Sequence, residues 1–67
     1  MNNSKSFVRK TILEMTEPFH LEDLYDRLLK QDVTDRGLVL QVMEELYRET
    51  LVDYIHLYNS TYAFAIV

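Results

Sequence analysis

Residues 19–54, FHLEDLYDRLLKQDVTDRGLVLQVMEELYRETLVDY, contain the clearest helical periodicity in the chain. Apolar residues at positions 21, 24, 25, 28 and 29 fall on one face of a helix, with His20 as its predicted N-cap. After the short connection at residues 31–33, Thr34 is a suitable N-cap for another helix over about residues 35–49. The stretch therefore predicts two helices joined by a short turn.

The segments on either side complete the predicted fold. Residues 6–15 place most of their apolar side chains on one helical stripe, and Pro18 separates this helix from the next. Beyond Thr50 the apolar period changes to two, which predicts strands over residues 51–58 and 61–67 around an Asn59-Ser60 turn. We expect a single α+β domain, residues 1–67, with three helices and a C-terminal two-stranded hairpin.

Strand alternation assigns each hairpin residue to one of two faces. With Asn59 and Ser60 in the turn, the predicted core face comprises Ile55, Leu57, Tyr62, Phe64 and Ile66. The opposite face includes Tyr54, His56 and Tyr58, and it is more apolar than a solvated face usually is. The second strand ends in AFAIV, so its edge is expected to pair either with the first strand alone or also with a second copy.

This order of elements resembles the winged helix-turn-helix superfamily, and residues 19–54 look like the core of ferric-uptake-regulator-type and related small bacterial repressor domains. The resemblance implies that Val33 fills the turn between the helices. It also implies that the third helix is anchored in the core by Val39, Met43 and Leu46. It leaves room for a short third strand near Phe19 and implies transcription regulation through DNA read by the third helix. The chain departs from the family at Thr50, where a glycine usually closes that helix.

Composition excludes several classes of function. The chain has no cysteine, so neither a disulfide nor a thiolate zinc site can form. The histidines, His20 and His56, fall in different predicted elements, and the single glycine, Gly37, cannot make a glycine-rich phosphate loop. We therefore expect no catalytic site, no metal site, no cofactor and no enzyme activity. Without a secretion signal or a run of about 18 apolar residues, we expect a cytoplasmic protein that makes no membrane contact.

Charge argues against the DNA contact that the resemblance implies. Eleven acidic residues against seven basic ones give a net charge of −4, whereas proteins that bind duplex DNA usually present a basic face. The outward side of the predicted third helix also places Glu44 and Glu45 beside Arg48. The residues that could still contact DNA are Lys5, Arg9, Lys10, Arg36, Gln41 and Arg48.

Surplus apolar residues favour protein contacts instead. The predicted third helix has an apolar arc of roughly 200°, wider than one core contact needs. Its Leu38 and Leu40 are therefore either shoulder positions, which lie at the edge of the core and are covered by the neighbouring helices, or part of a contact surface. The candidates for protein interaction are Leu13, Leu38, Leu40, Tyr54, His56 and Tyr58.

The sequence thus favours a small winged-helix regulatory module that acts mainly through protein-protein contacts. Its expected partner is a second copy in a homodimer, or another protein. The alternative is a DNA-binding transcriptional regulator that uses the third helix.

Overall fold

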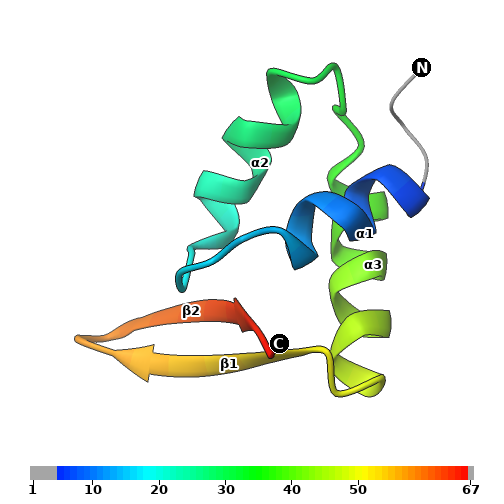
Figure 1. Ribbon diagram of the computed structural model, residues 1–67. Coiled ribbons are helices and arrows are strands. Elements are labelled where there is room, and N and C mark those ends of the chain that lie inside the picture. The colour runs from blue at the N-terminus through cyan, green and yellow to red at the C-terminus, as the bar shows by residue number, and fades with distance from the viewer. Residues whose placement is uncertain (1–4, 67) are drawn as a thin grey trace.

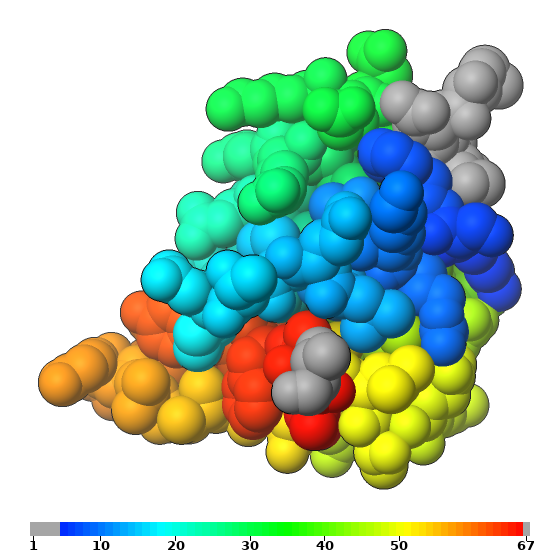
Figure 2. Space-filling view, in the orientation of Figure 1, coloured from blue at the N-terminus to red at the C-terminus, as the bar shows by residue number. Residues whose placement is uncertain are grey.

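The computed structural model describes residues 5–66, which form three helices followed by a two-stranded antiparallel hairpin (Figure 1). The elements in chain order are α1 (Lys5–Leu13), α2 (Leu21–Leu29), α3 (Arg36–Arg48), β1 (Val52–Leu57) and β2 (Ser60–Ala65). The predicted α+β class and the order of its elements are therefore confirmed. In the space-filling view the tip of the hairpin extends beyond the helices (Figure 2).

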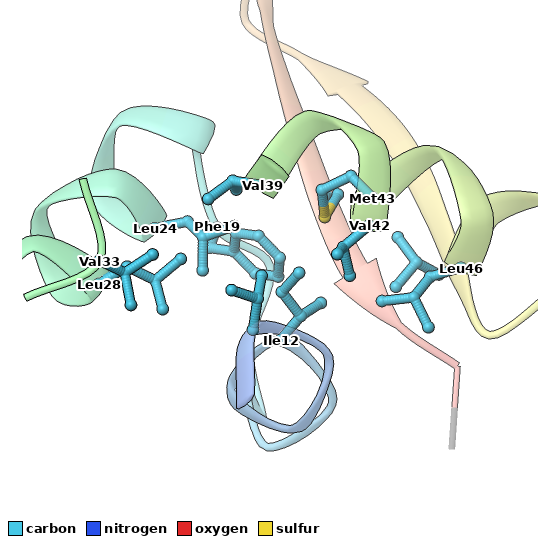
Figure 3. Packing of buried hydrophobic residues seen from close by; sticks show 12 residues of the cluster. Ile12, Phe19, Leu24, Leu28, Val33, Val39, Val42, Met43 and Leu46 are labelled. Atoms are coloured by element: carbon cyan, nitrogen blue, oxygen red, sulfur yellow. The ribbon is translucent and has the colours of Figure 1, made fainter. Parts of the chain in front are cut away.

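One hydrophobic cluster joins all three helices to the hairpin. Side chains from the three helices converge in it together with Phe19 and Val33 (Figure 3). Its helical members are Val8, Ile12, Leu24, Leu28, Val39, Val42, Met43 and Leu46, all of them buried. The removal of these apolar surfaces from water is the main force that holds the elements together. The three anchors expected in the third helix and Val33 in the turn before it lie in this core, as predicted.

The helix N-termini differ from the predicted caps. The N-cap of α3 is Asp35, whose side chain accepts a hydrogen bond from the Leu38 amide at 3.1 Å, so the prediction of Thr34 is wrong by one residue. A carboxylate satisfies that amide and also favours the positive end of the helix dipole. His20 does precede α2, but its side chain makes no capping hydrogen bond. Its ring lies against Tyr62 instead, with 4.1 Å between the ring centroids.

The turn between α2 and α3 is fixed by backbone hydrogen bonds around a left-handed residue. Asp32 has a φ of 63°, and its amide donates to the Leu29 carbonyl at 3.0 Å. The next amide, that of Val33, donates to the Leu28 carbonyl at 2.9 Å. These bonds turn the chain back at the end of the helix and direct the Val33 side chain into the core.

The C-terminus of α3 is closed in the same way. Thr50 has a φ of 60°, its amide donates to the Tyr47 carbonyl at 3.1 Å, and the Leu51 amide donates to the Leu46 carbonyl at 2.9 Å. This is a Schellman motif with threonine at the position that usually holds glycine. The departure noted in the sequence therefore leaves the helix end intact. It places a β-branched residue in a conformation that L-residues adopt at a cost.

The hairpin register differs from the prediction by two residues. The turn is formed by Tyr58 and Asn59, with φ values of 51° and 63°, and not by Asn59 and Ser60. Two left-handed residues make a type I′ turn, whose twist suits a tight hairpin. The strands then pair in the register Val52↔Ala65, Asp53↔Phe64, Tyr54↔Ala63, Ile55↔Tyr62, His56↔Thr61 and Leu57↔Ser60.

The predicted core face of the hairpin is the exposed one. A shift of two residues keeps the same side chains together on each face, but Val52 and Ala63 on the opposite face are buried, whereas Ile55 and Leu57 are exposed. The closed end of α3 fixes the direction in which the chain enters β1, so that Val52 meets the core. Of the side chains on this face, those of Val52 and Ala63 belong to the hydrophobic cluster.

The short third strand for which the resemblance leaves room near Phe19 is reduced to a single bridged residue. The Phe19 amide donates to the Ala63 carbonyl, and the Ala63 amide donates to the Phe19 carbonyl, both at 2.8 Å. The strand β2 therefore lies between Phe19 and β1 (Figure 1). Within residues 5–66 the outer edge of β1 has no neighbouring strand, whereas the outer edge of the C-terminal strand is bridged to Phe19 at Ala63 alone.

The substitution Thr50→Gly should stabilise the fold. A left-handed conformation costs an L-residue about 1–2 kcal/mol and costs glycine little, whereas glycine loses about 0.5–1 kcal/mol more in backbone entropy. We expect a net gain of up to about 1.5 kcal/mol, measured by urea unfolding.

A matched control is Thr34→Gly, at an exposed threonine that is not among the positive-φ residues. This variant carries the entropic loss without relief of strain and should be less stable than the parent chain. Equal effects of the two substitutions would contradict the strain assigned to Thr50.

Candidate interaction surfaces

Two ion pairs connect α1 to α3. The Nζ atom of Lys5 lies 3.0 Å from a carboxylate oxygen of Glu45, and the Arg9 guanidinium donates to both oxygens of Glu49 at 2.6 and 2.9 Å. Hydrogen bonding by Arg9 lowers the pKa of Glu49, and the same bond raises the pKa of Arg9. The second pair lies one helical turn after the first on both helices, since each of its residues is four positions further along the chain. In both pairs the cation already has a carboxylate partner and is less available to a phosphate.

Two more of the candidate DNA-contacting cations are paired with carboxylates. Arg48 lies 2.7 Å from Glu44 one turn earlier in α3, and Arg36 lies 4.0 Å from Glu22 of α2. The Arg36 guanidinium also sits over the Tyr25 ring, 4.5 Å from its centroid. Such exposed pairs add little stability, but they place a negative charge beside each cation. The structure therefore pairs four of the five cationic candidates.

The remaining DNA candidates, Lys10 and Gln41, lie on different helices. Both are exposed, and Lys10 forms no ion pair with another residue of the segment 5–66. One free lysine and one glutamine give a duplex backbone few contacts, since affinity grows with the number of phosphates that are neutralised. Of the six candidates, Lys10 is the one cation without an ion-pair partner within residues 5–66.

An exposed apolar surface lies along α3 and reaches β1. We call it the α3 surface, and its members are Leu40, Tyr47 and Tyr54, with exposed fractions of 47%, 51% and 39%. The rings of Tyr47 and Tyr54 are in contact, with centroids 5.4 Å apart and a tilt of 49°. Burial raises the pKa of Tyr54, with further contributions from Tyr47 and from Glu44. The contact therefore links the helix to the hairpin through neutral phenol rings.

The predicted interaction residues separate into two groups. Leu13 and Leu38 are half-buried and pack against the core, so Leu38 is a shoulder position, whereas Leu40 faces solvent. His56 and Tyr58 lie near the tip of the hairpin, and Tyr58, which is in the turn, is 94% exposed. The sequence candidates omit Tyr47, although its position on the apolar arc of the third helix could have signalled it.

A second exposed apolar surface covers the side of the hairpin that was predicted to be core. We call it the outer hairpin face, and it consists of Ile55, Leu57, Tyr62 and Phe64. Ile55 and Leu57 are 39% and 42% exposed, and the two aromatic residues are half-buried. The alternation in the sequence identifies this set of residues correctly. It does not say which face of the sheet the helices cover.

The free edge of β1 is capped by a side chain. Ala63 bonds outward to Phe19, so in an antiparallel ladder its partner Tyr54 must direct its amide away from β2. That amide donates to a carboxylate oxygen of Asp53 at 2.8 Å. Asp53 thus satisfies a backbone donor at the exposed edge and places a negative charge there, which discourages the addition of another strand.

The described part of the chain contains no cluster of three or more histidine and acidic side chains that could hold a metal ion. Its helices are also too short, or too polar, to cross a membrane. No family model, no curated protein and no solved structure matches this chain. Functional conclusions therefore have to come from the surfaces themselves.

The Arg9–Glu49 pair should make stability depend on pH. Because Arg9 lowers the pKa of Glu49 in the folded chain, the Glu49 carboxylate stabilises the fold above its ordinary pKa and loses this effect as the pH falls through the folded pKa. We expect Glu49→Gln to be less stable than the parent chain at neutral pH, with a difference that narrows in acid.

Urea unfolding at neutral and at acid pH measures this difference. Glu17→Gln removes an exposed carboxylate that has no ion pair within residues 5–66, and it should change stability little at either pH. A constant difference between Glu49→Gln and the parent chain at all pH values would contradict the assignment.

Proposed function

We propose that this chain is a winged-helix regulatory module that acts through protein-protein contacts, including contact with a second copy of itself, and that it is not an enzyme. Three helices followed by a hairpin, with Phe19 bridged to Ala63 as a minimal first strand, agree with the winged-helix arrangement. Such a scaffold serves many functions, so the proposal depends on which charged and apolar side chains the surface of this chain exposes.

The observation that carries the proposal is the contrast between paired charges and exposed apolar groups. Lys5, Arg9, Arg36 and Arg48 each lie within 4.0 Å of a carboxylate of the same chain. The outward side of α3 meanwhile exposes Leu40 and Tyr47. Neighbouring exposed apolar side chains are a feature of protein interfaces, whereas duplex DNA requires cations that can neutralise phosphates.

The proposed role is transcription regulation, which the resemblance to bacterial repressor domains implies. In a DNA-binding member α3 would enter the major groove with its outward side chains against the bases. Here that side combines Leu40 and Tyr47 with the paired Glu44 and Arg48, which suits an apolar protein partner better. Contact with DNA through α3, where Gln41 is exposed, is the alternative that the next experiment tests.

Binding to random duplex DNA should be weak at physiological salt and should depend only slightly on salt concentration. The reason is that intramolecular carboxylates already pair with four of the five cationic candidates, Lys5, Arg9, Arg36 and Arg48. Fluorescence anisotropy with a labelled duplex, at low and physiological salt, measures both quantities.

A variant can test this cause directly. Replacing Glu44, Glu45 and Glu49 with glutamine leaves Arg48, Lys5 and Arg9 without carboxylate partners, and each freed cation can add about 0.9 to the salt slope. We expect tighter, more salt-dependent binding by this variant, provided that circular dichroism indicates an intact fold. Tight and steeply salt-dependent binding by the parent chain would favour the DNA-binding alternative instead.

Self-association is the second expected property. The exposed apolar side chains on α3 and on the hairpin should make the mass in solution rise with protein concentration. Sedimentation equilibrium over tens to hundreds of micromolar measures this mass. A monomeric mass throughout the range would remove self-association from the proposed function.

A further inference from the structure

One cationic side chain of α2 is bonded to a sulfur atom instead of a carboxylate. The Nη1 atom of Arg27 donates to the Sδ atom of Met15 at 3.4 Å. Met15 lies two residues after the end of α1, so this contact joins the end of α1 to α2. Within residues 5–66 Arg27 takes part in no ion pair, so no carboxylate draws its guanidinium away. A thioether is a weak acceptor, and the bond is therefore weak in the reduced chain.

The sulfur atom of Met15 lies at the rim of the core. Its side chain is half-buried and packs against the hydrophobic cluster, whereas Arg27, which contacts the sulfur, is exposed. This contact places the sulfur on the solvent side of the packing. Met43 is different, because it is 1% exposed and belongs to the cluster itself. A peroxide dissolved in water can therefore reach Met15 in the folded chain but not Met43.

We propose that Met15 is a site of oxidation by peroxides and that Arg27 binds the sulfoxide that forms. In this two-electron step a lone pair of Sδ attacks one peroxide oxygen, and the S–O bond forms as the O–O bond breaks. The oxygen on sulfur gives its proton to the hydroxide that leaves, so hydrogen peroxide is reduced to water. The site lies outside the α3 surface and the outer hairpin face, and the inference does not rest on the proposed function.

The donor that would bind the sulfoxide is already in place. The sulfoxide oxygen is a much stronger acceptor than the thioether, and its hydrogen bond to a guanidinium is charge-assisted. With the oxygen about 1.5 Å from sulfur and about 2.9 Å from the donor, a bent arrangement places the donor nitrogen about 3.9 Å from sulfur. Starting from 3.4 Å, the nitrogen has to withdraw by about 0.5 Å. A long and exposed side chain such as that of Arg27 can make this movement.

Oxidation at Met15 should therefore change the stability of the fold little. A sulfoxide is polar and disrupts a methionine that packs against apolar side chains. At this site the hydrogen bond from Arg27 offsets the loss and strengthens the connection between the end of α1 and α2. Arg27 thus acts as the residue that makes the oxidised side chain compatible with the fold.

Treatment of the folded chain with hydrogen peroxide tests the site. Trypsin places each methionine in a separate peptide, so mass spectrometry can follow them individually. The Met15 peptide should gain one oxygen while the Met43 peptide stays reduced, and in concentrated urea both should react. A Met15 that stays reduced in the folded chain, or oxidation of Met43 ahead of it, would overturn the proposal.

The role of Arg27 is tested by urea unfolding of reduced and oxidised chains. Arg27→Ala removes the donor, and the matched control Lys30→Ala removes a cation at the end of the same helix that also has no ion pair within residues 5–66. Oxidation should raise the unfolding constant of Arg27→Ala at least about threefold more than that of the parent chain or of the control. Equal effects in all three chains would contradict the binding of the sulfoxide by Arg27.

A measurement on the parent chain keeps the test decisive if Arg27→Ala does not fold. The stronger acceptor should slow the exchange of the Arg27 guanidinium hydrogens with water, which NMR spectra of the side chain detect. The same peroxide treatment of Met15→Leu should leave this exchange unchanged. Exchange that is equally fast before and after oxidation of the parent chain would overturn the proposal.

Discussion

The burial of one face of α3 is the contact on which the other elements depend. Val39, Val42, Met43 and Leu46 are inaccessible or nearly so, and they meet side chains from both other helices (Figure 3). The hairpin depends on the same helix, because the Schellman motif at its C-terminus sets the direction in which β1 begins. A chain of this length buries a modest share of its surface, so few contacts elsewhere could replace this one.

Ion pairing between α1 and α3 affects the surface as well as the packing. Lys5 and Arg9 of α1 are among the residues that the sequence offered for contact with DNA, and their partners Glu45 and Glu49 lie within and at the end of α3, the helix that would approach DNA. These ion pairs between the helices therefore also neutralise charges that a nucleic acid would need. The same residues cannot serve both purposes at once, since a phosphate would have to compete with a carboxylate already in place.

Sequence periodicity predicted the helices and much of the core, because a helix has one apolar stripe and that stripe is buried. It failed on the hairpin, where each face carries apolar residues and the choice between them depends on how α3 ends and where Phe19 pairs. The turn was misplaced by one residue because Asn59 favours the left-handed conformation that it adopts, whereas Tyr58, the other left-handed residue of the turn, carries no such preference. Net charge was visible in the composition, but the pairing of Arg9 with Glu49 joins residues far apart in the chain and requires the fold.

The bridge between Phe19 and Ala63 has a consequence for the order of folding. Both residues belong to the hydrophobic cluster, and α2, α3 and β1 lie between them in the chain. A nascent chain can form α2 and α3 as local structure, but its core cannot close before Ala63 has been synthesised and brought back to Phe19. Closing such a long loop costs entropy before the contact repays it, so docking of the hairpin is expected to be the late step in folding.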